Sequence, residues 1–254
     1  MKHLILLLSF LFSVITFAQE SEEEVEKGPY DFLNFFDEER KEREVMTTTN
    51  LVVAIGWNQA LGDGNGIGDD YRFWGSGIFE FGIDFSTRLQ KEDDLLRFNY
   101  GLSVQRQTLR INGNRQFETN DDITTLEPVP FNVDKSKFAQ STLIVPLHLE
   151  IGRGELKTYD NGVSRYDRTE TFVVGIGGYL GLNTATSQLL EFERSGRDIS
   201  TSLNNDFEME RFVYGLSAYA GNHHLQIFAK YGLNTIFKDS PVDQRHVSIG
   251  FRFR

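Results

Sequence analysis

The stretch FWGSGIFEFGIDFSTRL, from Phe73 to Leu89, decides the fold because its apolar side chains recur at every second position. One parity carries a row of large apolar residues, namely Phe79, Phe81, Ile83 and Phe85. The opposite parity carries the charged residues Glu80, Asp84 and Arg88. Successive side chains of a β-strand point to opposite faces, so this stretch predicts a strand with one apolar and one polar face.

The same alternation recurs in seven other segments, at residues 51–58, 97–105, 142–151, 172–183, 211–218, 225–234 and 246–253. A tilted strand needs roughly 9–11 residues to cross a membrane, and these segments approach or exceed that length. An even number of antiparallel strands is typical of outer-membrane barrels. The chain is therefore expected to be all-β, a closed eight-stranded antiparallel up-and-down transmembrane β-barrel with long external loops.

The segments between the predicted strands alternate between long and short. Long external loops are expected at 61–72, 112–137, 184–210 and 238–245, and short periplasmic turns at 90–95 and 222–224. Segment 152–170 is too long for a turn, and its Asp160-Asn161-Gly162 triplet favours a type I′ hairpin. We therefore expect the fourth and fifth strands to extend below the membrane as a two-stranded ribbon.

Composition favours a membrane barrel over a soluble one. Hydrophobic residues make up only 39% of the chain and mean hydropathy is −0.35, yet it holds 22 Phe, 9 Tyr and 23 Gly. In a membrane barrel lipid covers the apolar face and the interior can be polar. Glycine, serine and asparagine on the polar parity suit a narrow interior. Aromatic girdles are expected from Trp57, Tyr71, Phe73 and Trp74 outside and from Tyr100, Phe251 and Phe253 towards the periplasm.

The first 49 residues are expected to lie outside the barrel. Residues 1–18 have Lys2, an apolar run and a small-residue cleavage site after Ala18, which is the pattern of a Sec-type signal peptide. Residues 19–49 hold 11 acidic and 4 basic residues, a net charge of −7, and are expected to form an acidic, partly disordered periplasmic lead. Residues 37–46 have charge spacings that favour a short helix. Residues 50–254 are then the barrel domain.

Several motifs resemble the PorT-type family of outer-membrane β-barrels. The segment TLIVPLHLE, from Thr142 to Glu150, is similar to the proline-centred fourth strand of that family, and Pro146 is its proline. Segments 174–181, 211–217, 229–236 and 247–253 are similar to the strands that follow. The resemblance covers residues 50–254 and implies an outer-membrane location in a Gram-negative envelope. The family's namesake is linked to type IX secretion, a role that is not carried over to this chain.

The final strand of such a barrel carries aromatic residues that the barrel assembly machinery reads during insertion. Phe251 and Phe253 are the candidates for this signal, although Arg254 follows them. Lipid is expected to contact an outward row formed by Phe79, Phe81, Ile83, Phe85, Leu143, Val145 and Leu147.

The inward parity carries charges of both signs, which must pair or stay hydrated in a narrow barrel. The expected interior network consists of Glu80, Asp84, Arg88, Arg97, His148, Glu150, Arg211, Lys230 and Arg252. A proton or ion path is one interpretation of this set. A structural network that fixes the register of the strands is the favoured one, because side chains fill an eight-stranded barrel.

The sequence offers little chemistry for catalysis or metal binding. His148 and Glu150 share a parity, but Ser141 points to the opposite face, so a Ser–His–Glu hydrolase is a remote alternative. The chain has no cysteine, and its Gly62–Asp70 segment lacks the ligand spacing of a calcium loop. His223 and His224 fall in a tight turn. No catalytic residue, metal or cofactor is expected.

These patterns predict a small integral outer-membrane protein with a structural, loop-binding or envelope-assembly role, and not a general porin. The alternative is a soluble periplasmic barrel that binds a ligand as lipocalins do, and an outer-membrane lipid deacylase is the remote third. Expected partners are outer-membrane lipid, the assembly machinery, and an envelope protein that contacts the loops or the lead. The net charge of −11 argues against nucleic acid.

Overall fold

Eight long strands form the barrel in the computed structural model, which describes residues 43–62, 69–91, 93–158, 163–238 and 243–254. The barrel strands are β2 (Thr47–Gly62), β3 (Tyr71–Arg88), β4 (Leu96–Ile111), β7 (Lys135–Ile151), β10 (Val173–Arg194), β12 (Phe212–Gly221), β13 (Leu225–Gly232) and β14 (Gln244–Phe253). All pair antiparallel, and β14 closes the ring against β2, from Gln244↔Gly62 to Phe253↔Val53. The fold prediction is confirmed, and β2 begins three residues before the predicted boundary at 50.

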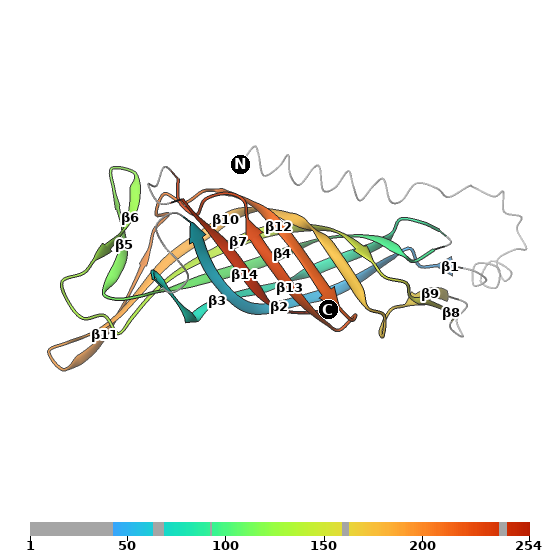
Figure 1. The fold of residues 1–254 in the computed structure, drawn as a ribbon, viewed down its shortest axis with the longest axis horizontal. Coiled ribbons are helices and arrows are strands. Elements are labelled where there is room, and N and C mark those ends of the chain that lie inside the picture. The colour runs from blue at the N-terminus through green and yellow to red at the C-terminus, as the bar shows by residue number, and fades with distance from the viewer. Residues whose placement is uncertain (1–42, 63–68, 92, 159–162, 239–242) are drawn as a thin grey trace, which may run out of the picture. The chain divides into compact units, whose positions relative to one another are not determined.

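Shorter strands project beyond the two ends of the barrel (Figure 1). At the end that we call the loop end lie the hairpin β5 (Arg115–Asn120)–β6 (Ile123–Pro128) and β11 (Arg197–Asn204), which extends β10 as a second hairpin. At the opposite, turn end lie β8 (Glu155–Thr158) and β9 (Val163–Asp167), the predicted ribbon. Its proposed turn triplet, residues 160–162, lies outside the described residues.

Two segments that were expected as loops, 112–137 and 184–210, contain hairpins. Asp121 and Asp122 have φ of 50° and 63°, and Ser195 and Gly196 have φ of 54° and 71°. Positive φ at both central positions of a two-residue turn is the type I′ geometry, whose twist matches that of the paired strands. The register from Ser187↔Asn204 to Arg194↔Arg197 shows that the β10–β11 hairpin is regular over its whole length.

The chain enters the barrel as a strand and not as a helix. Arg43–Glu44 form the short strand β1 in a three-stranded sheet with the order β1-β9-β8, and the Val45 amide donates to the Ser164 carbonyl at 3.0 Å. The helix predicted over 37–46 is thus wrong for its last residues, because backbone pairing with the ribbon outweighs the charge spacing. The predicted signal peptide and the predicted lead up to residue 42 lie outside the described residues. No helix in the described part of the chain is long and apolar enough to cross a membrane.

The barrel surface carries the predicted apolar row. Phe79, Phe81 and Ile83 are 47–49% exposed, whereas Glu80 and Asp84 on the opposite parity are buried. The rest of the row, Phe85, Leu143, Val145 and Leu147, is half-buried on the same surface. The outward residues of the barrel strands, including Phe251 and Phe253, form what we call the apolar belt.

Stacked aromatic residues lie near each end of the belt. Near the loop end, the Trp57 ring stacks on Phe73 at 5.6 Å and meets Trp74 edge-on at 6.5 Å. Towards the turn end, the Tyr100 ring stacks on Phe85 at 5.5 Å and on Phe98 at 5.6 Å. These clusters lie where the girdles were predicted.

Tyr71 was predicted in the outer girdle, and this is wrong because its side chain is buried inside the barrel. A bulge between Arg72 and Gly77, where Gly75 has φ of +96°, shifts the pairing of β3 with β4. A bulge adds residues to one strand and thereby reverses the parity beyond it. The Tyr71 hydroxyl donates to Gln244 Oε1 at 2.5 Å inside the barrel.

Candidate functional site

The turn end of the bore holds a group of buried ion pairs that we call the ionic cluster. It consists of the carboxylates Asp84, Asp94 and Glu150 and the guanidinium groups of Arg97, Arg168, Arg252 and Arg254. Their side chains are at most 11% exposed. Buried charges are tolerated only when paired and hydrogen-bonded, so the cluster fixes the strands that supply it.

Glu150 is the centre of the ionic cluster. Its Oε1 accepts from Arg168 Nη1 at 2.5 Å, and its Oε2 accepts from Arg254 Nη1 at 2.8 Å. Oε2 also accepts from Asn99 Nδ2 at 2.8 Å and from the Tyr219 hydroxyl at 2.7 Å. One carboxylate on β7 thereby holds groups from β4, β12 and the segments outside the strands.

Asp84 and Asp94 complete the ionic cluster. Asp84 Oδ2 contacts Arg252 Nη2 at 2.8 Å and Arg254 Nη2 at 3.0 Å. Asp94 Oδ1 contacts Arg97 Nη2 at 2.5 Å. The Arg252 guanidinium also lies over the Tyr219 ring, 4.4 Å from its centroid, which adds a cation–π contact. A Cβ at Gly175 would lie 2.2 Å from that ring, so glycine there is what lets the ring lie against β10.

Strand parity predicted four members of this cluster, Asp84, Arg97, Glu150 and Arg252. It missed Asp94 and Arg168, which lie in turns, and Arg254, which lies beyond the last strand. Two predicted residues form a separate pair, because Lys230 Nζ contacts Glu80 Oε2 and donates to Gln105 Oε1 at 2.8 Å. Arg88 is buried at the turn end, where its Nη1 donates to the Lys91 carbonyl at 2.9 Å. The placement of Arg211 is wrong: it is exposed because β12 begins only at Phe212.

The loop end of the bore is closed by different chemistry. Ten buried apolar or aromatic residues pack together there, Ala60, Tyr71, Leu109, Ile111, Phe117, Phe138, Phe207, Met209, Ile236 and Phe237. We call this group the apolar plug. The Phe138 ring lies 4.8–5.6 Å from the rings of Phe117, Phe207 and Phe237. Four members, from Phe207 to Phe237, lie in connections outside the strands, so strand parity could not predict the plug.

Polar contacts anchor the β5–β6 hairpin above the plug. The Phe117 amide donates to Gln188 Oε1 at 2.8 Å, and Gln188 Nε2 donates back to the Phe117 carbonyl at 3.3 Å. The side chain of Gln188 thus bonds to this peptide as a neighbouring strand would. Arg115 Nη1 contacts Asp70 Oδ1 at 2.6 Å, and Gln244 Nε2 donates to Asp70 Oδ2 at 3.3 Å.

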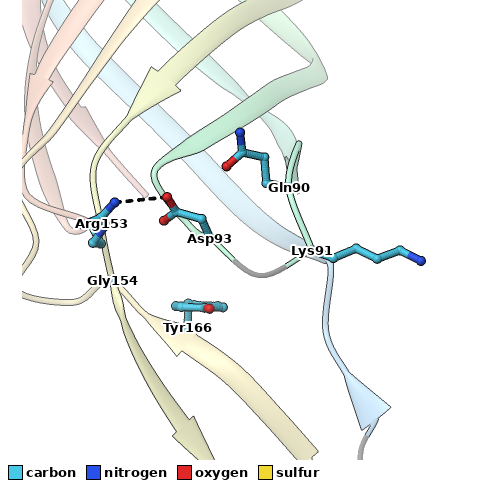
Figure 2. A pocket seen from close by; sticks show the side chains of 6 residues that line it. All are labelled: Gln90, Lys91, Asp93, Arg153, Gly154 and Tyr166. Carbon is cyan, nitrogen blue, oxygen red and sulfur yellow. Dashed lines mark hydrogen bonds and ion pairs between the residues drawn. The ribbon is translucent and has the colours of Figure 1, made fainter.

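Two open depressions flank the barrel ends. At the turn end, a hollow of about 810 Å³ is lined by Gln90, Lys91, Asp93, Arg153, Gly154 and Tyr166. Figure 2 shows the Arg153–Asp93 ion pair, at 3.0 Å, on one side of it, and Lys91 pointing away from the other labelled residues. At the loop end, a groove of about 400 Å³ runs between β5 and the β10–β11 hairpin. Its walls include Glu118, Asn120, Thr201 and Leu203.

A serine and a histidine do meet inside the barrel, but not the predicted pair. His148 Nε2 lies 2.6 Å from Ser217 Oγ, whereas Ser141 Oγ accepts from Arg106 Nη1 at 3.2 Å on the other face. The space beside His148 and Ser217 measures about 20 Å³, room for a particle the size of a water molecule. Pro146 lines the same space. Among the described residues, no three His, Asp or Glu side chains are grouped as ligands of one metal ion.

The structure of the chain has a weak likeness to a solved protein. No family model and no curated protein matches the chain, so the PorT-type resemblance stays a prediction. A solved structure of Ail, the attachment invasion locus protein of Yersinia pestis, in complex with the heparin analogue sucrose octasulfate, is 14% identical with a TM-score of 0.31. The match covers 82% of this chain and 100% of that one. A TM-score this low is not evidence for the fold. The closed eight-stranded barrel is shown by the strand pairing of this chain itself.

Proposed function

We propose that this chain is a small integral outer-membrane protein whose bore is closed and whose loop-end hairpins bind a partner. The observation that carries the proposal is the apolar belt around a charged interior. A soluble protein places its charges outside and its apolar residues inside, and this barrel does the reverse. Three neighbouring outward residues of β3 alone, Phe79, Phe81 and Ile83, are about half exposed.

The two closures support a role other than that of a general porin. The ionic cluster fills the bore at the turn end, and the apolar plug fills it at the loop end. Porins that conduct small solutes have wider barrels of 16–18 strands with an aqueous lumen. We therefore expect the purified protein to give no stable conductance in planar bilayers, and step-like openings in native protein would contradict this.

The membrane location is tested by substitutions at two equally exposed apolar sites. Phe81→Arg places a charge in the belt, where it should cost about 2–4 kcal/mol and block insertion. Leu203→Arg is the matched control, because Leu203 is 51% exposed but lies on β11, beyond the barrel. Fractionation and heat-modifiable gel mobility report insertion. Recovery of folded Phe81→Arg protein from a soluble periplasmic fraction would overturn the proposal and favour the soluble ligand-binding barrel.

The finer assignments belong to the same proposal. A signal peptide cleaved after Ala18 would place the acidic lead in the periplasm and the loop-end hairpins outside the cell. Membership of the PorT-type family and an envelope-assembly role are further parts of the proposal. Mass spectrometry of the mature protein should then give Gln19 as the first residue. An uncleaved chain would contradict export by this route.

The groove between β5 and the β10–β11 hairpin is the surface where we expect the partner to bind. Binding residues concentrate on loops that a rigid scaffold positions, and these hairpins are anchored by Gln188 and Arg115.

No observation favours the deacylase: the Ser217–His148 pair is enclosed in a space too small for a lipid acyl chain. Unchanged lipid composition in a His148→Ala strain is the expected result, and altered acylation would revive the enzyme hypothesis.

A further inference from the structure

A small cavity at the turn end lies inside the barrel, next to the ionic cluster. It measures about 20 Å³, which is room for one water-sized particle. Its wall includes Asn50 on β2, Ser86 on β3 and Arg254, together with Arg97, Arg168 and Glu150 of the cluster. Residues from several strands therefore reach the cavity.

Three of the lining side chains have hydrogen-bond donors without an acceptor in the described part of the protein. These donors are Arg254 Nε, Ser86 Oγ and Asn50 Nδ2. The side chains of Arg254 and Ser86 are each only 2% exposed. Asn50 lies opposite Asp84 in the β2–β3 register, and Asp84 contacts Arg254, so the three donors belong to one neighbourhood.

The ionic cluster brings several cationic side chains to this cavity. The ionic cluster holds four guanidinium groups, which stay charged in proteins, and three carboxylates. Glu150, the one carboxylate in the cavity wall, already accepts from Arg168, Arg254, Asn99 and Tyr219. A particle in the cavity therefore meets hydrogen-bond donors from guanidinium, hydroxyl and amide groups.

We infer that this cavity is a binding site for a small monovalent anion of the size of chloride. A water molecule has two acceptor sites and two hydrogens that need acceptors of their own, whereas a halide accepts from three or more donors and donates none. The volume leaves no room for phosphate or sulfate.

The test uses the full chain folded in detergent micelles. Thermal unfolding is measured in chloride, bromide, sulfate and gluconate at constant ionic strength, and crystals grown with bromide are examined for anomalous scattering. We expect a higher Tm in chloride and bromide than in gluconate or sulfate, because a ligand that binds the folded state stabilises it. A bromide peak should lie beside Ser86 and Arg254.

Two serine variants separate the site from a general salt effect. Ser86→Ala removes one donor and should weaken the apparent halide affinity by about tenfold. Ser136→Ala is the matched control, because Ser136 is also 2% exposed with an unpartnered hydroxyl but lies on β7 at the loop end. The same Tm in all four salts, or an equal chloride shift in both variants, would overturn the inference and leave water in the cavity. If Ser86→Ala does not fold, the bromide peak in the native protein decides.

Discussion

The two ends of the bore are closed by opposite means. The turn end holds seven charged side chains in the ionic cluster, and the loop end holds ten apolar or aromatic ones in the apolar plug. Four of the seven cluster residues lie on barrel strands, and so do five of the ten plug residues. The comparison teaches that one narrow barrel can be sealed either by paired charges or by apolar packing, and that strands and connections contribute to both.

The two closures also differ in what they require. Ion pairs at the turn end must be complete, because a single missing partner leaves an uncompensated charge in a buried place. Aromatic packing at the loop end loses stability in proportion to the volume removed, since neighbouring rings relax only in part. The predictions below test this difference, from the largest expected effect to the smallest.

The largest effect is expected from Glu150→Gln. The substitution keeps the shape of the side chain but leaves Arg168 and Arg254 without their shared carboxylate, at a cost of about 3–5 kcal/mol. Guanidinium unfolding followed by tryptophan fluorescence measures the loss. Glu191→Gln is the control, because its pair with Lys135 is about one-third exposed and should cost under about 1 kcal/mol. Equal losses in the two variants would show that the ionic cluster does not hold the barrel together.

Phe237→Ala should cost about 3 kcal/mol, at the lower end of the range for a buried phenylalanine, because its segment lies outside the strands and can collapse into the space. The barrel should survive this loss with its turn end unchanged. Hydrogen exchange should rise in the plug segments around Met209 and Ile236 and stay constant at Glu150. Phe131→Ala, at a 41% exposed position, is the control, and faster exchange at Glu150 would contradict independent closures.

Gln188→Leu removes both hydrogen bonds to the Phe117 peptide and should cost about 1–2 kcal/mol. The effect should be local: amide exchange should become faster at Phe117 and Thr119 and stay unchanged in the apolar belt. Gln116→Leu, at the adjacent position of β5, is the control, because the Gln116 side chain donates to Glu118 Oε1 and not to the Phe117 peptide. Unchanged exchange at Phe117 would show that packing alone holds the hairpin down.

The smallest effect is expected in the ribbon, outside both closures. A hydrogen bond from the Lys157 ammonium, aided by Thr169, holds the pKa of Asp167 well below its ordinary range. A lowered carboxyl pKa stabilises the folded state above the unfolded value of about 3.9, and the contribution disappears as pH falls through the folded pKa. The NMR signals of β8 and β9 should therefore keep their intensity from pH 7 to below pH 4. Asp167→Asn should weaken these signals over the whole pH range. Titration of Asp167 at an ordinary carboxyl pKa would refute this.

The sequence predicts most of the barrel because period-two alternation is a direct consequence of strand geometry. The alternation alone predicts that Phe81 points out of the barrel and that Glu150 points into it. It fails where the period is broken: the bulge at Gly75 reverses the parity of Tyr71, and Arg211 lies one residue before its strand. Charge spacing predicted a helix over 37–46, of which Arg43 and Glu44 instead pair as a strand beside the ribbon.

The candidate site is harder to predict from the sequence for the same reason, because several of its residues lie outside the regular strands. Asp94, Arg168 and Arg254 lie outside the strands, so nothing in the pattern distinguishes them from ordinary exposed charges. Phe207 and Phe237 are isolated aromatic residues in segments that read as loops. Their burial follows from long-range packing, which a local period does not record.

The β10–β11 hairpin has a practical consequence for protein engineering. A side chain at Gly196, in its turn, would meet nothing within 4 Å, and the strands below it keep register from Arg194↔Arg197 down to Ser187↔Asn204. A foreign peptide grafted between Ser195 and Gly196 would therefore be carried on a two-stranded stalk, clear of both closures. The barrel is in that sense a ready scaffold for presenting an epitope.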